Sequence, residues 1–322
     1  MKKPFLCIVT PALADANNGN WQTARRWARM LSGHYRVRVA QAWSEGDEGD
    51  VLLALHARRS AASVAAWAQA HPDRPLVLAL TGTDLYRDIA SDASAQRSLA
   101  LAHRLIVLQE QGPLALPEAL RDKCRVVFQS GTRRQTLAKT TAHLRVVMVG
   151  HLRDEKWPQN LFDAARLLRP DEGIHIDHIG AAIDPALGEA ARATAQACLH
   201  YRWLGGLPRA ATLARMQRAH LLVHTSRMEG GAHVLMEALL CGTPVLASHI
   251  DGNVGMLGTD YGGYFPPGDA PALVRALRAC REDLAAPVGR LAALQAQCEA
   301  RAPLFEPRIE QAALLALLQE PH

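Results

Sequence analysis

The sequence lacks the features of a membrane-spanning, zinc-binding or disulfide-rich secreted protein. Nowhere in its 322 residues do about 18 apolar residues follow one another, so we expect no transmembrane helix. Its six cysteines form no C-x-x-C pair and no zinc-like spacing with histidine, which favours buried or free thiols in a reducing compartment. The apolar run Phe5–Val9 is too short for a signal peptide, is flanked by Pro4 and Pro11, and has no cleavage site. We therefore expect a cytoplasmic protein whose first strand begins here.

Blocks of like charge, repeats and clustered metal ligands are also missing. The net charge is +5, but Lys and Arg are scattered, which favours a small phosphorylated ligand over nucleic acid. No Asp-x-Asp stretch and no His/Cys cluster occurs, so we expect neither a metal nor another cofactor. Apolar residues make up 49% of the chain, enough for sizeable hydrophobic cores in two domains.

Short apolar segments alternate with helical segments along the whole chain, and this pattern predicts parallel strands covered on both faces. The expected strands are 5–10, 37–42, 51–55, 76–80, 105–108, 126–128, 145–149, 175–179, 200–204, 221–224 and 244–247. The expected helices are 22–31, 61–70, 94–102, 159–168, 186–198, 210–218, 234–241 and 307–318.

The pattern starts again after a polar stretch near residues 135–143, which predicts two doubly wound α/β domains. We place the first domain at 1–140 and the second at 141–303, with a C-terminal segment, 304–322, that can return to the first. Ligands of open α/β sheets bind at the carboxyl ends of the strands, and two such domains facing each other leave a cleft there. Chemical residues are therefore expected on loops after strands.

The most informative segment, 226–248, turns through glycines, opens a helix and ends it at a glycine followed by proline. A helix that begins near Ala232 directs its unpaired N–H groups toward the loop, which suits a diphosphate. Gly230 and Gly231 let a ligand approach the backbone closely. Glu229 precedes this helix and Glu237 lies within it, so their carboxylates can accept hydrogen bonds from sugar hydroxyls.

This segment resembles the E-x7-E region of retaining GT-B glycosyltransferases, in particular glycosyltransferase family 4. The resemblance implies that Glu237 holds the ribose of a nucleotide-sugar and that Glu229 contacts the transferred sugar in the catalytic centre. It also places Gly230, Gly231, Ala232 and His233 around the donor.

Two further segments of the second domain resemble donor-binding parts of that family. The stretch from Gly150 to Trp157 is similar to its G-R-L-x-x-x-K-G loop, and Lys156 falls on the lysine that neutralises the diphosphate. His151 stands where the family has arginine, so either Arg153 or a protonated His151 would supply the second charge. Gly205, after a strand, matches a glycine near which the family holds the base, whereas Trp203 beside it is more typical of a core residue.

In the first domain, Asn18, Gly19 and Asn20 occupy the place of the family's glycine-rich loop beside the donor sugar. Thr81 stands where the family often carries histidine, and Asp84 is either a ligand or a helix N-cap.

A further departure follows the E-x7-E segment. Gly255 stands where a carboxylate is common, which leaves Asn253 as a candidate for hydrogen bonds to an acceptor. An anionic acceptor also needs positive partners, for which the sequence offers an unranked set: Arg25, Arg26, Arg87 and Arg227.

These departures, with the strings 17–21, 229–234, 250–258 and 261–266, resemble one branch of the family, the selenosugar synthases of selenoneine biosynthesis. That resemblance implies transfer of a sugar, N-acetylglucosamine, from a UDP-sugar to selenophosphate. An alcohol acceptor needs a base, whereas selenophosphate is already an anionic nucleophile. Three alternatives stay open: a family 4 O-glycosyltransferase, a UDP-sugar 2-epimerase, and a non-catalytic UDP-sugar-binding protein. None of these candidate functions involves nucleic acid or stable membrane association.

Overall fold

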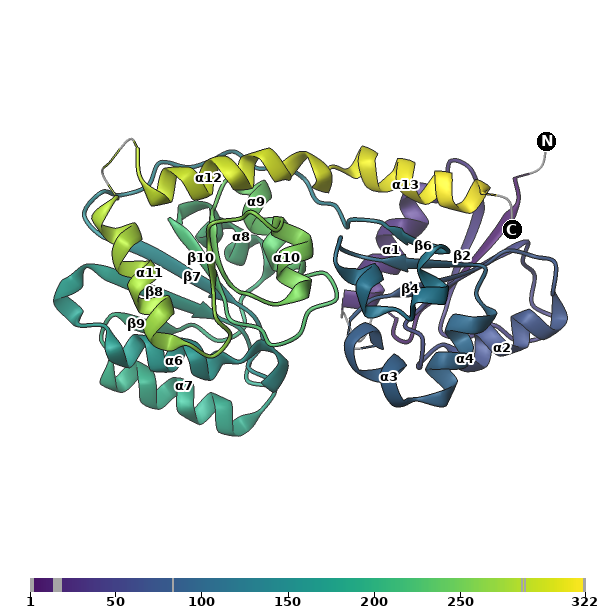
Figure 1. The fold of residues 1–322 in the computed structure, drawn as a ribbon, viewed down its shortest axis with the longest axis horizontal. Helices are drawn as coiled ribbons and strands as arrows, with labels where there is room; N and C mark the ends of the chain where they lie inside the picture. The colour runs from purple at the N-terminus through teal and green to yellow at the C-terminus, as the bar shows by residue number, and fades with distance from the viewer. Residues whose placement is uncertain (1–2, 14–18, 83, 285, 287, 321–322) are drawn as a thin grey trace. The chain divides into compact units, whose positions relative to one another are not determined.

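In a computed structural model the chain forms two α/β units, each built on one six-stranded sheet (Figure 1). The structure describes residues 3–13, 19–82, 84–284, 286 and 288–320. Unit 1 consists of Met1–Ser130 with Pro307–His322, and unit 2 of Gly131–Glu306. All strand pairs are parallel, as expected for the two doubly wound domains of a GT-B fold.

The sheet of unit 1 has the strand order β2-β1-β3-β4-β5-β6. Its strands are β1 Phe5–Val9, β2 Arg36–Ala40, β3 Val51–Leu55, β4 Leu76–Leu80, β5 Arg104–Val107 and β6 Cys124–Val126. Its α-helices are α1 Gly19–Leu31, α2 Ala61–Ala70, α3 Ile89–Ser91, α4 Ala93–Leu101, α5 Glu118–Arg121 and α13 Pro307–Gln319, and a π-helical turn spans Asp84–Asp88.

Alternate side chains of β1 pack into two different hydrophobic cores of unit 1, because successive side chains of a strand point to opposite faces of the sheet. Leu6 and Ile8 pack with Trp27 of α1 and with apolar residues of α13. Cys7 and Val9 pack on the other face with Trp67 of α2 and with residues of α4. Both faces are therefore buried, which explains the continuous apolar runs of these strands.

The sheet of unit 2 has the strand order β12-β11-β10-β7-β8-β9. Its strands are β7 Leu144–Val149, β8 Ile174–Ile179, β9 Tyr201–Trp203, β10 Leu221–His224, β11 Val245–Ser248 and β12 Tyr264–Phe265. Its α-helices are α6 Pro158–Leu167, α7 Pro185–Ala197, α8 Arg209–Arg218, α9 His233–Leu240, α10 Asp251–Leu257, α11 Ala270–Glu282 and α12 Arg290–Arg301. Helix α6 packs against α7 and α11, while α9 packs on β10 and β11 (Figure 1).

The structure contains several elements that the sequence pattern did not predict, and one boundary differs. The short helices α3 and α5, the helices α10, α11 and α12, and the short strand β12 were not expected from the pattern. Residues 131–140 belong to unit 2 rather than to the first domain, because Gly131 and Arg134 donate backbone hydrogen bonds to Phe305 and Leu240. The expected strands lie within one or two residues of the observed ones.

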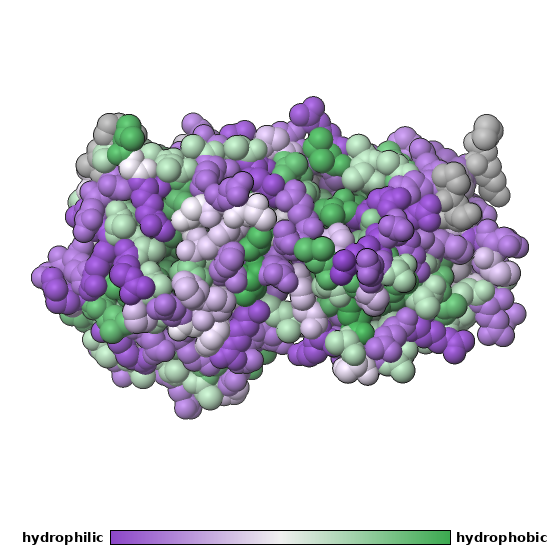
Figure 2. Space-filling view, in the orientation of Figure 1, coloured by the Kyte–Doolittle hydropathy of each residue, from purple (hydrophilic) through white to green (hydrophobic). Residues whose placement is uncertain are grey.

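Hydrophilic residues cover most of the face seen in Figure 2, and hydrophobic residues appear there in small groups. All six cysteines are buried free thiols. Among the described residues, no helix is both long enough and apolar enough to cross a membrane.

Helix α13 is fixed to unit 1 by Glu310, a carboxylate that is only 1% exposed. It accepts hydrogen bonds from Arg26 Nε at 2.9 Å and from Trp27 Nε1 at 2.6 Å, both on α1. The backbone N–H and hydroxyl of Ser130 also donate to it, at 2.9 and 2.5 Å. A buried charge with this many partners is well satisfied, and its removal leaves several donors unpaired.

We predict that Glu310→Ala lowers the free energy of unfolding by about 3 kcal/mol, at the low end for a broken buried pair because Arg26 is partly exposed. Guanidinium-induced unfolding of the variant and of the wild type measures this difference. The matched control is Glu45→Ala, which removes an exposed carboxylate of the same unit. A loss no greater than that of the control would show that Glu310 does not fix α13.

Candidate functional site

The sheet of unit 2 has its topological switch point between β7 and β10. Beginning at β7, the chain adds β8 and β9 on one side of the sheet and β10, β11 and β12 on the other. The carboxyl ends of two adjacent parallel strands then carry loops that diverge, and ligands of open α/β sheets bind in the crevice between such loops. Here these are the loops that contain Lys156 and Glu229.

Backbone and side-chain hydrogen bonds join these two loops. The N–H of Arg227 donates to the carbonyl of Glu155 at 2.9 Å, and the hydroxyl of Thr225 donates to the carbonyl of Lys156 at 2.8 Å. Lys156 Nζ then pairs with Glu229 Oε1 at 2.5 Å, with only 15% and 11% of the two side chains exposed. Two residues 73 positions apart in the sequence are thus brought into one ion pair.

His224 stands behind this ion pair at the end of β10. Its Nε2 lies 3.2 Å from Glu229 Oε1, and its side chain is 1% exposed. Burial raises the pKa of Glu229, but Lys156 and His224 together outweigh burial and hold that pKa far below its usual range. Burial also lowers the pKa of His224. The site therefore holds an ionised carboxylate and a neutral imidazole at neutral pH.

Two glycines permit the close backbone approach on which the site depends. A Cβ on Gly252 of α10 would lie 2.0 Å from the carbonyl oxygen of Glu229. A Cβ on Gly180, after β8, would lie 1.9 Å from the carbonyl oxygen of Gly150. Larger residues at 180 and 252 would push both loops out of place.

Helix α9 begins at the glycine-rich turn and presents its amino end there, as the sequence predicts. Its N-cap, Ala232, contributes no side-chain hydrogen bond, and Gly230, Gly231 and His233 flank it. A helix start of this kind offers backbone N–H groups and a positive dipole end to an anion.

Glu237 of α9 contacts a residue that sequence reasoning missed. Its Oε1 accepts hydrogen bonds from Arg209 Nε at 3.1 Å and Arg209 Nη2 at 2.7 Å, and 18% of the Glu237 side chain is exposed. Both residues line a cavity of about 50 Å³ with Gly131 and Arg134. Arg209 follows Pro208 at the start of α8, and no sequence spacing relates it to Glu237.

The neutral state of His151 favours Arg153 as the second positive charge. His151 Nδ1 accepts the backbone N–H of Ala181 at 3.1 Å, and burial with the charges of Arg153 and Lys156 lowers its pKa. Protonation of this imidazole is therefore disfavoured, which argues against the expectation that His151 carries a charge. Arg153 is a permanent cation with about half of its side chain exposed.

Trp157 occupies the position of the family's loop glycine and adopts a left-handed backbone, with φ 44° and ψ 56°. Such a conformation costs a non-glycine residue free energy and needs support from its surroundings. The Arg227 guanidinium provides it from 3.7 Å above the indole ring, and Arg227 also pairs with Asp154 at 3.1 Å. Arg227 is thus held beside Lys156 at the switch point.

Two of the other predicted ligands of unit 2 lie differently. Gly205, with φ +64°, accepts the N–H of Gly180 through its carbonyl at 2.8 Å and so lies beside the loops after β7 and β8. Asn253 is fully buried, and its Nδ2 donates to Ser248 O at 2.8 Å. The Asn253 amide thus holds the end of β11 through Nδ2, whereas its Oδ1 has no hydrogen-bond partner among the described residues, and its contact with an acceptor stays a prediction.

In unit 1 the predicted residues lie at the carboxyl ends of the strands or nearby. Gly19 and Asn20 begin α1, whereas Asn18 lies outside the described residues. Thr81 follows β4, and its buried Oγ1 has no hydrogen-bond partner among the described residues. Asp84 is fully buried and accepts two backbone N–H groups, so it is neither an exposed ligand nor a helix N-cap.

No group of three or more His, Cys, Asp or Glu side chains suited to a metal ion occurs in the described part of the chain. Lys156, Arg153, Arg227 and Glu229 lie at the switch point together with Asp154 and Glu155, which pair with Arg227 and Arg153.

Residues 129–284, which contain this whole arrangement, match the family model described as glycosyl transferases group 1. This match covers most of unit 2. The E-x7-E segment and the lysine loop lie within the matched residues, in agreement with the resemblance to that family.

Several solved structures share the fold of this chain across both units. Anabaena HepE in complex with UDP-glucose is 18% identical, with a TM-score of 0.73, and the match covers 98% of this chain and 99% of HepE. Sucrose-phosphate synthase from Thermosynechococcus elongatus is 14% identical, with a TM-score of 0.74 and 98% of each chain covered. The pneumococcal O-GlcNAc transferase GtfA, in complex with UDP and GlcNAc, is 16% identical, with a TM-score of 0.64, over 91% of this chain and 59% of GtfA. These similarities establish the GT-B fold.

The Lys156–Glu229 ion pair predicts a pH-dependent effect on stability. The pKa of Glu229 is lowered in the folded state, so its contribution is present above its unfolded pKa of about 4.3 and is lost as the pH falls. In Lys156→Met, burial acts with less opposition and raises that pKa, which makes the ionised carboxylate destabilising.

The free energy of unfolding of Lys156→Met should therefore fall further below the wild type at pH 7 than at pH 3.5. The two differences should themselves differ by at least about 1.4 kcal/mol, the equivalent of one pKa unit. Urea unfolding at both pH values measures this, and Arg153→Met is the matched control from the same loop. A destabilisation that is equal at both pH values would contradict the assigned charge state.

Proposed function

We propose that this protein is a glycosyltransferase that moves N-acetylglucosamine from a UDP-sugar to selenophosphate and forms a carbon–selenium bond. The donor half of the proposal depends on one observation: the Lys156–Glu229 pair and the start of α9 lie together at the switch point of a glycosyl transferase group 1 domain. HepE and GtfA, which share the fold, are known in complex with UDP or UDP-glucose. The assignment of UDP to this chain extends that similarity.

In the donor site we expect the diphosphate between Lys156 and the first turn of α9. Departure of UDP builds negative charge on the diphosphate, and preorganised cations and N–H groups stabilise that charge. Lys156 Nζ can turn from Glu229 to a phosphate oxygen, which frees Glu229 to accept a hydroxyl of the donor sugar. Arg153 or Arg227 supplies a second cation beside the same loop.

Glu237 is expected to bind the ribose hydroxyls, and this expectation is supported by its carboxylate lining a small cavity together with Arg209. Glu237→Ala should weaken UDP binding by about 1.5–3 kcal/mol, the range for hydrogen bonds to a charged group. Isothermal titration calorimetry with UDP measures the change. Glu189→Ala, which removes an exposed carboxylate from α7, is the control, and equal affinities for the two variants would remove this role from Glu237.

The proposal that selenophosphate is the acceptor depends on the lack of an accessible base at the positions where family 4 enzymes carry polar groups. Thr81 replaces a histidine, Gly255 is buried within α10, and Asp84 is fully buried. A hydroxyl acceptor in such a site would forgo general-base catalysis, which is worth typically 10²–10⁴ in rate. Selenophosphate needs no deprotonation, because its selenium is already an anionic, soft nucleophile.

The reaction then proceeds by attack of selenium on the anomeric carbon. The bond between that carbon and the diphosphate oxygen breaks, and its electron pair leaves with UDP. Charge stabilisation by Lys156 and the helix terminus therefore acts at the oxygen that gains the electrons.

Incubation of the protein with UDP-N-acetylglucosamine and selenophosphate in excess EDTA should yield a selenium-containing sugar and UDP, detected by mass spectrometry. Simple alcohols should be inert acceptors. The rate should also be flat with pH around 6.5, because burial lowers the pKa of His56, His151 and His224 and keeps these imidazoles neutral there.

Transfer to a hydroxyl while selenophosphate remains unreacted would contradict the proposed acceptor and favour a family 4 O-glycosyltransferase. Conversion of the donor alone, without an acceptor, would indicate a 2-epimerase. UDP binding with no turnover of any donor would indicate a binding protein.

A further inference from the structure

Unit 1 has a switch point of its own, which carries a polar cluster that the donor site does not use. In its strand order, β2 lies on one side of β1 and β3 to β6 follow on the other, so the chain diverges between β1 and β3. The loop after β3 contains His56, Arg58 and Arg59, and the turn after β4 contains Arg87 and Asp88. These segments lie at the sheet edge where ligands of open α/β sheets bind.

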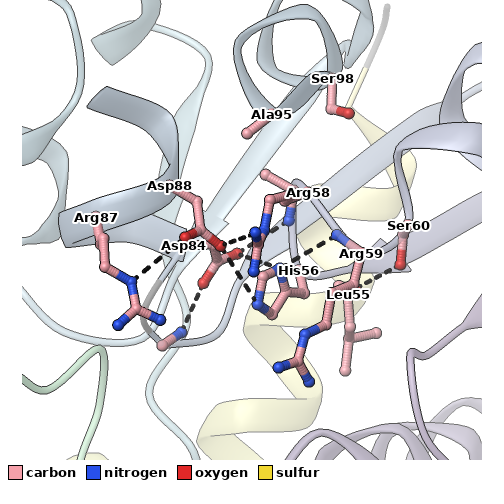
Figure 3. Close-up of polar contacts among 12 residues, drawn as sticks. Leu55, His56, Arg58, Arg59, Ser60, Asp84, Arg87, Asp88, Ala95 and Ser98 are labelled. Carbon is pink, nitrogen blue, oxygen red and sulfur yellow. Dashed lines mark hydrogen bonds and ion pairs between the residues drawn. The ribbon is translucent and has the colours of Figure 1, made fainter. Parts of the chain in front are cut away.

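His56 is held in a conformation that its own backbone disfavours. Its φ is 74°, and its side chain is buried between two carboxylates (Figure 3). Nδ1 lies 3.8 Å from Asp84 Oδ2, and Nε2 lies 3.8 Å from Asp88 Oδ2. Left-handed backbone at a non-glycine residue persists only where the surroundings impose it, and such residues concentrate at functional sites.

Asp84 joins the two segments that surround His56. Its Oδ2 accepts the N–H of Ala57 at 3.0 Å, in the loop after β3, and its Oδ1 accepts the N–H of Gly82 at 2.9 Å, after β4. Burial raises the pKa of Asp84 despite these bonds, and burial lowers the pKa of His56. Both groups shift toward their neutral forms, so they fix the loops while adding little net charge.

The charge at the surface of this cluster belongs to arginines. Arg58 Nε lies 3.1 Å from Asp88 Oδ2, and Arg87 Nε lies 3.5 Å from Asp88 Oδ1. Asp88 is only 5% exposed, whereas 44% of the Arg58 side chain and 54% of the Arg87 side chain are exposed. Arg59 follows in the same loop and is also exposed. Two exposed guanidinium groups thus lie against one buried carboxylate, so the accessible charge of the cluster is positive.

We propose that Arg58 and Arg87 form a binding site for a tetrahedral oxyanion of the phosphate type, which is the acceptor of the reaction. This inference rests on the proposed function, since it supplies the positive partners that an anionic acceptor requires. The carboxylate of Asp88 meets both guanidiniums at Nε and orients them from the buried side. Planar guanidinium forks of fixed direction match the oxygens of a phosphate group better than flexible ammonium groups do.

The arrangement also explains why a strained histidine is retained in this loop. His56 and Asp84 fix the backbone from which Arg58 projects, so less side-chain entropy is lost when the anion binds. Asp88 and His56 are therefore positioning residues, and Arg58 and Arg87 are the residues that contact the ligand.

The test is titration of the full-length protein with orthophosphate while UDP saturates the donor site, so that phosphate cannot report on Lys156. Arg58→Gln and Arg87→Gln should each raise the Kd for orthophosphate at least ~10-fold, as expected for loss of a charge-assisted hydrogen bond. Arg97→Gln removes an exposed arginine of α4 in the same unit and should leave both the Kd and the turnover unchanged. Affinity for UDP, measured by calorimetry, verifies that each variant is folded.

The steady-state KM for selenophosphate should rise with the Kd for orthophosphate, and Arg58→Lys should lie between wild type and Arg58→Gln because it keeps the charge but loses the fork. If the wild type transfers to a hydroxyl instead, while orthophosphate still binds through Arg58 and Arg87, the proposed function falls and the anion site stands. If selenosugar forms with an unchanged KM in the Arg58→Gln/Arg87→Gln double variant, the anion site is wrong and the proposed function stands. Failure of orthophosphate to bind the UDP-saturated wild type would likewise overturn the site.

Discussion

The ion pair between Lys156 and Glu229 joins the two loops that leave the switch point of the second sheet. Its geometry requires that β7 and β10 be neighbours although more than 70 residues separate them, and the 3-2-1-4-5-6 type of strand order provides this. His224 closes the buried side, and Gly252 lets α10 approach the backbone of Glu229. A buried pair is costly to leave unpaired, so the two loops keep a fixed relation even without a ligand.

Both units pair a cation with a carboxylate beside the switch point of the sheet, but the cation is a lysine in unit 2 and an arginine in unit 1. Each places a cationic side chain at the carboxyl ends of the strands beside its switch point and pairs it with a largely buried carboxylate: Glu229 for Lys156, and Asp88 for Arg58. Lysine suits a site in which the charge must move from an internal partner to a leaving group, because its ammonium is a compact and rotatable donor. Arginine suits a site that must hold an incoming anion in one orientation.

Much of the fold could be predicted from the sequence, because buried parallel strands are continuous apolar runs and the helices between them are amphipathic. The strands from 51 to 55 and from 76 to 80 were predicted at their observed bounds. Helix α10 could not be predicted, since its sequence, Asp-Gly-Asn-Val-Gly, is typical of a turn and becomes helical through tertiary contacts. The short polar linker likewise gave no sign that residues 131–140 bond to unit 2.

The residues of the candidate site could likewise be predicted only in part from the sequence. Lys156 was singled out from the lysine loop and Glu229 and Glu237 from the E-x7-E spacing, and the structure brings Lys156 and Glu229 together. The burial of Asn253 and Asp84 could not be predicted, because only tertiary structure shows which polar groups bond to buried backbone partners. His56, Arg58 and Arg209 were missed because they contact residues on other segments, and no sequence spacing relates them to those partners. The one signal was His-x-Arg-Arg directly after a buried strand, which by itself is typical of an ordinary surface loop.

We expect the switch point of unit 2 to receive the diphosphate of the nucleotide. A crystal structure of the protein with UDP tests this most directly. It should show the diphosphate between Lys156 Nζ and the first turn of α9, with the Lys156–Glu229 pair opened and the ribose on Glu237. UDP bound elsewhere, or at this site with the Lys156–Glu229 pair intact and no phosphate contact to Lys156, would contradict the account.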